Sequence, residues 1–283
     1  MSPLALLCTL LLLTIPASLP AQQPLSQLSP ADLTHAFVQH ETSAPNNQHA
    51  YTFLILHRDL NYVHGIRTGD DTYKSEMIYI GGLPYVHRIE HNGKPLRGKE
   101  LEHENQLYDK TLRERTGLTD EVRSKLLNQK THSVQSLPPL DQLESQFRPQ
   151  IAGHPTLDGH PSILLDLTPL HPDAPPPLQR HILLTLDASN LNILQSHVEL
   201  LATDNGFRKG TLFETRNSYV NGVLLPASTS ADTTINLKWH FIPFTLHLIG
   251  TDEFSSYRRF TTSVTLKSTS DPDVPASPTP RRN

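Results

Sequence analysis

The chain contains 16 histidines, so imidazole chemistry is the first kind to consider. His35 and His40 are five residues apart on a predicted helix, which at about 100° per residue places them on different faces. A helical zinc protease needs two histidines four residues apart with a glutamate after the first, and this sequence meets neither condition. His87 and His91 are roughly 13 Å apart along a predicted strand, too far to share one ion. Both pairs therefore favour polar surface over a metal site.

A third group of histidines, His154, His160 and His171, lies in a segment rich in proline and glycine. Histidines in such a loop either collect metal ions or form polar surface, and we favour polar surface. If they did bind metal, the protein would be a metal-dependent hydrolase, and His154→Ala and His160→Ala would each abolish stoichiometric metal binding. This hydrolase remains an alternative, and we assign no metal ligand.

The sequence lacks the other common catalytic signatures. It has no Gly-x-Ser-x-Gly elbow for a serine nucleophile, and Gly81-Gly82 is not followed by the lysine-containing helix start of a phosphate loop. Glu100, Glu102 and Glu104 lie on a charged predicted helix, where a solvated face explains them. The sequence therefore predicts no catalytic residue, no cofactor and no enzymatic activity, and it leaves the ligand-binding residues unidentified.

The chain begins with a mostly apolar run at residues 4–15, followed by small and turn-forming residues and then by Gln22 and Gln23. This order is typical of a secretory signal peptide, because the run is too short to span a bilayer as a helix. We expect cleavage after Ala21, and a retained membrane anchor is the alternative. Cys8 follows Leu7, where lipoprotein processing needs a small residue, so a lipid on Cys8 is not expected.

Cleavage would remove the single cysteine, so the mature chain could form no internal disulfide and use no thiol nucleophile. The formal net charge of −4 is mild, and nucleic-acid binding needs clustered positive charge, so nucleic acid is not an expected partner. We also expect no transmembrane segment after cleavage, because no second long apolar run follows. The expected location is the periplasm or the exterior of a Gram-negative-type envelope.

Local signals in the first half predict a helix that Ser29 caps and that ends near Glu41. Strands are expected at residues 51–56, 77–80 and 84–91, with turns at residues 69–71 and at Asn92-Gly93. Three helices then follow: a charged helix at residues 98–115, a shorter one capped by Thr119, and one near residues 140–147.

The second half predicts strands joined by short turns at residues 187–190, 204–206 and 221–222, which indicates an antiparallel meander. The expected strands are at residues 162–167, 181–187, 194–201, 211–220, 234–239, 241–249 and 259–267. The predicted organisation is a signal peptide at residues 1–21, a single domain at 22–267 with a helical insertion at about 98–147, and a disordered tail rich in proline and serine at 268–283. The fold class is α+β, mainly β.

Three stretches of sequence carry a family resemblance. They are MIYI at residues 77–80 continuing through YVHR at 85–88 into NGKPL at 92–96, then NGVLLP at 221–226, and EFSSYRRF at 253–260. In this order they resemble the outer-membrane lipoprotein-sorting (LolA/LolB-like) superfamily of exported bacterial proteins. The resemblance extends over about residues 50–267.

The resemblance implies a curved antiparallel half-barrel sheet covered by helices on its concave face, with an apolar cavity for acyl chains and no cofactor. The first hypothesis is therefore a non-enzymatic periplasmic protein that binds a lipid or the acyl chains of a lipoprotein. An envelope structural or assembly factor that binds a protein partner is the alternative, and the metal-dependent hydrolase is the second alternative. Whether the sheet encloses an apolar hollow or is filled by its own side chains bears directly on the first hypothesis.

Overall fold

The computed structural model describes residues 25–43, 51–133, 137–204, 206–239 and 242–259. The expected signal peptide, Cys8 and the expected tail at residues 268–283 lie outside these ranges. Within them, no helix combines the length and the apolar character that crossing a bilayer requires.

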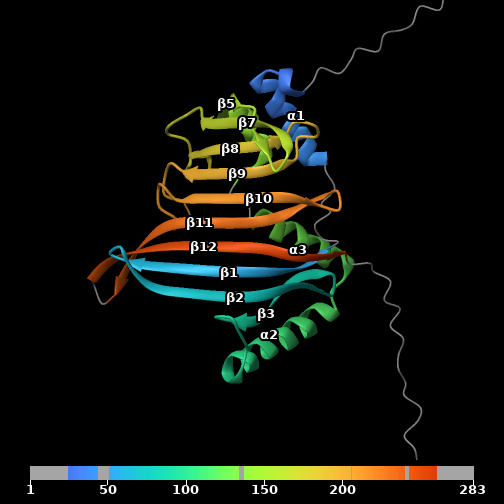
Figure 1. Cartoon of the computed structure of the whole chain (residues 1–283), viewed down its shortest axis with the longest axis vertical. Helices are drawn as coiled ribbons and strands as arrows, with labels where there is room; N and C mark the ends of the chain where they lie inside the picture. The colour runs from blue at the N-terminus through green and yellow to red at the C-terminus, as the bar shows by residue number, and fades with distance from the viewer. Residues whose placement is uncertain (1–24, 44–50, 134–136, 205, 240–241, 260–283) are drawn as a thin grey trace, which may run out of the picture. The chain divides into compact units, whose positions relative to one another are not determined.

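The described chain is mainly an antiparallel sheet (Figure 1). The hydrogen-bonded order is β4-β3-β2-β1-β12-β11-β10-β9-β8-β7-β5, and β6 pairs with β7 beside this path. The strands are β1 (Tyr51–Val63), β2 (Ile66–Ile80), β3 (Leu83–His91), β4 (Lys94–Pro95), β5 (Phe147–Gly153), β6 (Thr156–Leu157), β7 (His160–Pro169), β8 (Arg180–Asp187), β9 (Ile193–Leu200), β10 (Leu212–Val220), β11 (Val223–Trp239) and β12 (Ile242–Arg259). The order begins at β4 and ends at β5, so the sheet is open. The expected fold class, mainly β with an open antiparallel sheet, is confirmed.

Helices are few, and the longer ones are α1 (Pro30–Ser43), α2 (Gly98–Thr116), α3 (Asp120–Ser133) and α4 (Leu140–Gln146), with short 3₁₀ turns η1 (Leu25–Gln27) and η3 (Pro176–Leu178). The chain divides into two compact units. Unit 1 comprises Met1–Pro45, Arg58–Asp70 and Gln129–Asp252, and unit 2 comprises Asn46–His57, Asp71–Asn128 and Glu253–Asn283.

The core of unit 1 lies between one face of its strands and the helices α1 and α4. Alternate residues of the strands face this core, as the period of two in a half-buried strand requires. They are Ile163, Leu165 and Leu167 of β7, Ile182, Leu184 and Leu186 of β8, and Val198 of β9. Leu33 and Phe37 of α1, Leu143 of α4 and Phe147 at the start of β5 pack against them and are fully buried. The helices therefore fill this apolar face, which in unit 1 is not an open trough.

The start of α1 follows the predicted capping pattern. The Ser29 carbonyl accepts a hydrogen bond from the Leu33 amide at 2.8 Å, and the Ser29 hydroxyl oxygen accepts one from the Asp32 amide at 3.2 Å. Both bonds satisfy backbone donors that the first helical turn leaves without intrahelical partners. The helix ends at Ser43, two residues beyond the predicted end.

In unit 2, the tight turn between β2 and β3 packs against the C-terminal end of α2, the first helix of the insertion. Gly81 has φ +57°, and a Cβ there would lie 2.7 Å from the carbonyl oxygen of Arg115 in α2, so the close approach requires glycine. The Arg115 guanidinium donates to the carbonyl oxygens of Leu83 and Pro84 at 3.0 and 3.1 Å. Thr119 caps α3 as predicted, because its hydroxyl oxygen accepts a hydrogen bond from the Val122 amide.

The predicted turn at residues 69–71 is wrong. These residues lie in β2, and the chain turns instead at His64 and Gly65, whose φ angles are +51° and +77°. The Arg58 side chain of β1 makes two hydrogen bonds of 2.9 Å to the Asp70 carboxylate, so Asp70 serves a cross-strand ion pair rather than a turn. The local turn preference of Gly69-Asp70 therefore does not determine the structure here, where both residues belong to β2.

Several strand boundaries also differ from the predictions. β11 begins at residue 223 rather than 234, and the strand expected from residue 241 continues to Arg259 as β12. β5 is an additional strand that the sequence does not predict, and its first residue, Phe147, was expected to end a helix. The turns at Asn92-Gly93 and Asn221-Gly222 are confirmed, with φ between +50° and +79°.

Candidate functional site

The face of the unit 1 strands opposite the core carries charged side chains beside the half-buried Leu164 and Leu183. Three imidazole–carboxylate pairs link neighbouring strands on it: His181–Asp166 at 2.9 Å, His197–Glu214 at 2.9 Å and His247–Asp232 at 2.6 Å. Within β7 to β10 the paired residues occupy positions that alternate with the buried ones, so their side chains lie on the face opposite the core. These pairs account for three of the histidines as cross-strand partners.

The Asp187 carboxylate at the end of β8 is the most enclosed acid of unit 1, with only 3 % of the residue exposed. It accepts hydrogen bonds from the Ser189 amide at 2.8 Å, from the Ser189 hydroxyl at 2.5 Å and from the Tyr219 hydroxyl at 2.9 Å. His160 Nδ1 lies 3.6 Å from it. Burial raises the pKa of Asp187, but these hydrogen bonds and His160 outweigh burial, so its pKa is lowered and the group is anionic.

The Tyr219 hydroxyl connects Asp187 to α1. It accepts hydrogen bonds from the side-chain amides of Asn190 at 2.9 Å and Asn192 at 3.1 Å, while the Asn192 carbonyl oxygen lies 2.9 Å from His40 Nε2. Tyr219 therefore has a satisfied hydroxyl and a fixed ring, and His40, predicted as polar surface, belongs to this network.

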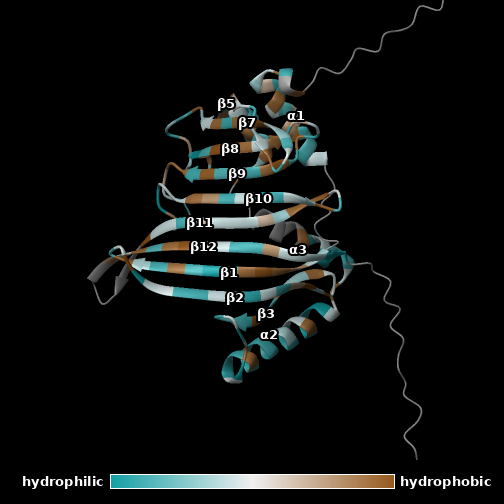
Figure 2. Ribbon diagram, viewed as in Figure 1, coloured by the Kyte–Doolittle hydropathy of each residue, from teal (hydrophilic) through white to brown (hydrophobic). Residues whose placement is uncertain are grey.

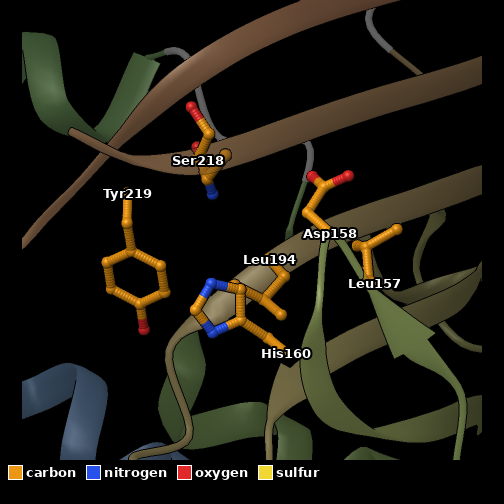
Figure 3. Close-up of a pocket in the computed structure, with 7 residues that line it drawn as sticks. Leu157, Asp158, His160, Leu194, Ser218 and Tyr219 are labelled. Carbon is orange, nitrogen blue, oxygen red and sulfur yellow. The ribbon is translucent and has the colours of Figure 1, made fainter.

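A pocket of about 240 Å³ opens beside Tyr219 (Figure 3). Its lining comes from the β6–β7 turn, β9 and β10: Leu157, Asp158, His160, Leu194, Asn217, Ser218 and Tyr219. The Tyr219 and His160 rings lie side by side, with centroids 4.9 Å apart. The Asp158 carboxylate forms an ion pair with Arg216 at 2.5 Å. The pocket thus combines two aromatic faces, apolar leucines and one rim carboxylate.

The helix α2 of unit 2 turns a polar side toward β3. Glu104 is buried, and its carboxylate accepts hydrogen bonds from the Tyr85 hydroxyl at 2.9 Å and the Arg88 amide at 3.3 Å. Tyr108 of the same helix contacts the rings of Tyr85 and His87, with centroids 5.9 and 5.7 Å away. The charged helix predicted as solvated is therefore attached to the sheet through its carboxylate.

Tyr85 is expected to make stability depend on pH in alkaline solution. Burial first, and then the hydrogen bond to Glu104, raise the pKa of Tyr85 to about 12 in the folded protein. An unfolded tyrosine ionises near pH 10, so the unfolded state loses its proton first. The stabilising contribution of Tyr85 is therefore complete below about pH 10 and is lost as the pH rises toward about 12.

Denaturant unfolding of the wild type and Tyr85→Phe at a series of alkaline pH values measures this effect. The difference in free energy of unfolding should shrink as the pH rises above about 10. A difference that stays constant would show that the folded protein does not raise the pKa of Tyr85. Comparing the wild type with Tyr85→Phe at each pH cancels the contributions of Tyr79 and Tyr257 to the free energy of unfolding, since burial raises their pKa values in both proteins.

Several apolar side chains of α2 and one of α3 are partly exposed. Leu101, Leu107 and Leu112 of α2 and Val122 of α3 are each 40–43 % exposed. In Figure 2 α2 appears mostly hydrophilic, with separate hydrophobic positions. An amphipathic helix of a globular protein normally faces its leucines inward, so this surface differs from that of a helix that only covers a sheet.

An aromatic cluster in unit 2 joins β1 and β12. Phe53 contacts both Phe254 and Tyr257, with ring centroids 5.7 and 5.1 Å away, and Tyr51 lies 6.3 Å from Tyr257. Residues three apart on a regular strand point to opposite faces. Ser256, with φ +56°, interrupts the strand so that Phe254 and Tyr257 reach the same partner.

A second, smaller pocket of about 70 Å³ lies between β2, β3 and α2. The Arg88 guanidinium lies 4.1 Å above the Tyr73 ring, and the His91 ring stacks on Tyr73 at 4.5 Å. His91 Nδ1 also lies 2.8 Å from the Glu100 carboxylate. His87, which lies on the same strand as His91, contacts Tyr108 instead, so the two histidines do not share a partner.

The other histidines singled out by sequence are dispersed. His35 lies 3.2 Å from the Glu144 carboxylate of α4, whereas His40 is directed to Asn192. His154 and His171 are exposed, and of their predicted group His160 lines the larger pocket. In the part of the chain that the structure describes, no three His, Cys, Asp or Glu side chains lie close enough to hold a metal ion.

Sequence reasoning missed Asp187, Tyr219 and Glu104. Asp187 was read only as a turn residue, although an aspartate that accepts the amide two residues later, as it does from Ser189, is a known local signal. Tyr219 and Glu104 carried no local signal, because their partners lie 32 and 19 residues away.

Comparisons with known proteins return structures and no sequence relatives. No protein-family model and no curated protein matches the chain. Similar solved structures include a LolA superfamily protein from Nitrosomonas europaea, with 11 % identity, coverage of 81 % of this chain and 93 % of that one, and a TM-score of 0.33. A DUF1329 family protein from Desulfovibrio piger has 11 % identity, coverage of 84 % and 95 %, and a TM-score of 0.36.

A complex of MucA and MucB from Pseudomonas aeruginosa also matches, with 12 % identity, coverage of 82 % and 99 %, and a TM-score of 0.24. At these scores and identities we take neither a site residue nor a function from any of the three. The first of the three carries the name of the superfamily that the sequence resembles.

Proposed function

We propose that this chain is an exported, non-enzymatic binding protein of a bacterial envelope that holds a lipid or a lipidated partner through unit 2. The observation that carries the proposal is the partial exposure of Leu101, Leu107 and Leu112 on α2 and of Val122 on α3. An exposed apolar side chain gains free energy when a ligand removes it from water, about 25 cal/mol per Å² of apolar area.

The spacing of α2 supports a continuous contact along one side of the helix. Leu101 and Leu112 are eleven residues apart, which at about 100° and 1.5 Å per residue places them within roughly 20° of each other and about 16 Å apart. Tyr108 lies between them on the same side and already contacts β3. An acyl chain laid along this side would bury methylene groups worth about 0.8 kcal/mol each.

The packing of unit 1 supports placing the site in unit 2. The apolar face of unit 1 is filled by α1 and α4, and its opposite face carries imidazole–carboxylate pairs. The exposed leucines of α2 therefore offer an acyl chain a better-supported place than these two faces of the described unit 1 strands do.

A protein partner without lipid is the second candidate, and the charged surroundings of the leucines favour it. Lys110 and Glu114 form an exposed pair on α2, 3.9 Å apart, near Leu107 and Leu112. Apolar residues surrounded by a charged rim are typical of protein interfaces.

The test begins with the mature protein purified from the envelope, extracted with organic solvent and analysed by mass spectrometry, together with displacement of a fluorescent fatty acid. The double variant Leu101→Ser/Leu112→Ser should weaken fatty-acid binding by about tenfold or more, because it removes two apolar contacts. Its unfolding midpoint should change little, since exposed positions contribute within about 0.5 kcal/mol. Leu170→Ser, at an exposed leucine of unit 1, is the matched control and should bind normally.

Three results would contradict this proposal or part of it. If no acyl species is extracted and no fluorescent fatty acid is displaced, the lipid is excluded. If one protein co-purifies without lipid and the double variant loses it, the second candidate replaces the first. If the double variant binds as well as Leu170→Ser, the surface of α2 is not the site.

A further inference from the structure

We propose that the Tyr219 pocket of unit 1 binds a small organic ammonium cation with a short apolar body. The pocket is formed within unit 1 and is independent of the proposed lipid contact of unit 2. Its volume of about 240 Å³ corresponds to roughly eight water volumes, so the ligand has on the order of eight non-hydrogen atoms.

The electrostatic balance around the pocket favours a cation. The Asp187 carboxylate behind the Tyr219 and His160 rings is anionic, and its hydrogen-bond donors, Ser189 and Tyr219, are uncharged. Arg216 neutralises Asp158 at the rim. With a neutral His160 the group therefore has one negative charge in excess, and in a partly enclosed site such a charge attracts a cation more strongly than in water.

The aromatic lining suits an ammonium group more than a metal ion. The faces of aromatic rings attract organic cations within about 6 Å of the ring centroid. Tyr219 is held in place by Asn190 and Asn192, so its ring is ordered before a ligand arrives. Leu157 and Leu194 supply apolar contacts for the carbon part of the ligand, whereas a hard metal ion would need several oxygen ligands.

An anionic ligand fits the same pocket poorly. It would lie near Asp158 and would have to compete with Asp158 for Arg216, while Asp187 contacts the lining residues Tyr219 and His160. A neutral molecule would leave the excess negative charge of the group without a compensating positive charge. The ligand chemistry is therefore an alkylammonium, carried either by a free amine or by the headgroup of a phospholipid.

Nuclear magnetic resonance titration of the full mature chain tests the proposal, in mildly alkaline buffer so that imidazoles are neutral. The probes are ethanolamine, choline and the neutral isostere of choline in which carbon replaces nitrogen. We expect both cations, and not the isostere, to shift the backbone amide signals of residues 157–160 and 217–219. Equal shifts from the isostere, or no shift from either cation, would overturn the proposal.

Variants locate the interaction. Asp158→Asn should weaken choline binding by about fivefold or more, and Tyr219→Leu should weaken it similarly because it removes the ring. Asp232→Asn makes the same chemical change at an exposed aspartate of the face opposite the core and should bind as the wild type does. Because Asp158 is about half exposed, its variant is expected to fold even if Tyr219→Leu does not. Unchanged binding by folded Asp158→Asn would overturn the proposal.

Binding to vesicles distinguishes the two possible sources of the ammonium group, a free amine and a phospholipid headgroup. Sedimentation with phosphatidylethanolamine vesicles but not with phosphatidylglycerol vesicles, lost in Asp158→Asn, would assign the lipid headgroup. Binding of free ethanolamine without binding to either vesicle would assign a free amine. Preference for phosphatidylglycerol vesicles that Asp158→Asn leaves unchanged, with no binding of free amine, would contradict the proposal.

Discussion

Replacing Phe37 by alanine is expected to lower the free energy of unfolding by about 3–5 kcal/mol. The Phe37 side chain is fully buried between α1 and the apolar face of the unit 1 strands, in contact with the cluster that includes Ile163 and Leu184. Its removal takes away buried apolar area and leaves a cavity, because packed neighbours relax only partly.

Urea unfolding of the variant and the wild type measures this loss, with Leu101→Ala as the matched control. Leu101 also lies on a helix, but it is 43 % exposed, so its truncation should cost less than about 1 kcal/mol. If both variants unfolded at the same urea concentration, α1 would not be packed on the sheet as described. An apolar trough would then be open in unit 1, and the proposed place of the lipid would have to change.

Replacing Asp204 by alanine is also expected to cost about 3–5 kcal/mol, because it leaves a nearly buried arginine without its carboxylate. Arg180 at the start of β8 forms an ion pair with Asp204 at 2.8 Å, and the two side chains are only 12 % and 9 % exposed. Removing one charge of such a pair leaves the other desolvated and poorly compensated.

The control is the exposed pair Arg216–Asp158, in which both side chains are 47 % exposed. Asp158→Ala should cost less than about 1 kcal/mol, because solvent screens an exposed pair. The double variant Arg180→Met/Asp204→Leu should recover much of the stability lost in Asp204→Ala, since it removes both buried charges. If Asp204→Ala were as stable as Asp158→Ala, burial would not determine the strength of these pairs.

The two units differ in how completely they are packed, and this difference bears on function. Fully buried large side chains concentrate in unit 1, on β5, β7, β8, β9, α1 and α4. Unit 2 buries Ile80, Leu83 and Leu96 but leaves Val86, Leu101 and Leu112 substantially exposed. A ligand that removes these side chains from water would complete the packing, which is why the proposed binding surface lies in unit 2.

The start of a helix or the position of a turn could be predicted from the sequence where a single residue or a single apolar periodicity determines it. The start of α1 at Ser29 and Pro30 and the turns at Asn92-Gly93 and Asn221-Gly222 depend on capping and on φ angles that few residues adopt. Prediction failed at Gly69-Asp70, which lie inside β2, because local turn preference does not report the long strand pairing of β1 with β2.

The sequence by itself determined the fold class, the predicted export signal and most of the element boundaries, since apolar periodicity and turn residues act over a few positions. Only the tertiary structure decided which groups meet. Asp187, Tyr219 and His160 come together through three strands, and Glu104 reaches Tyr85 because α2 folds back on β3. Such contacts depend on strand register and on helix placement, which no short stretch of sequence specifies.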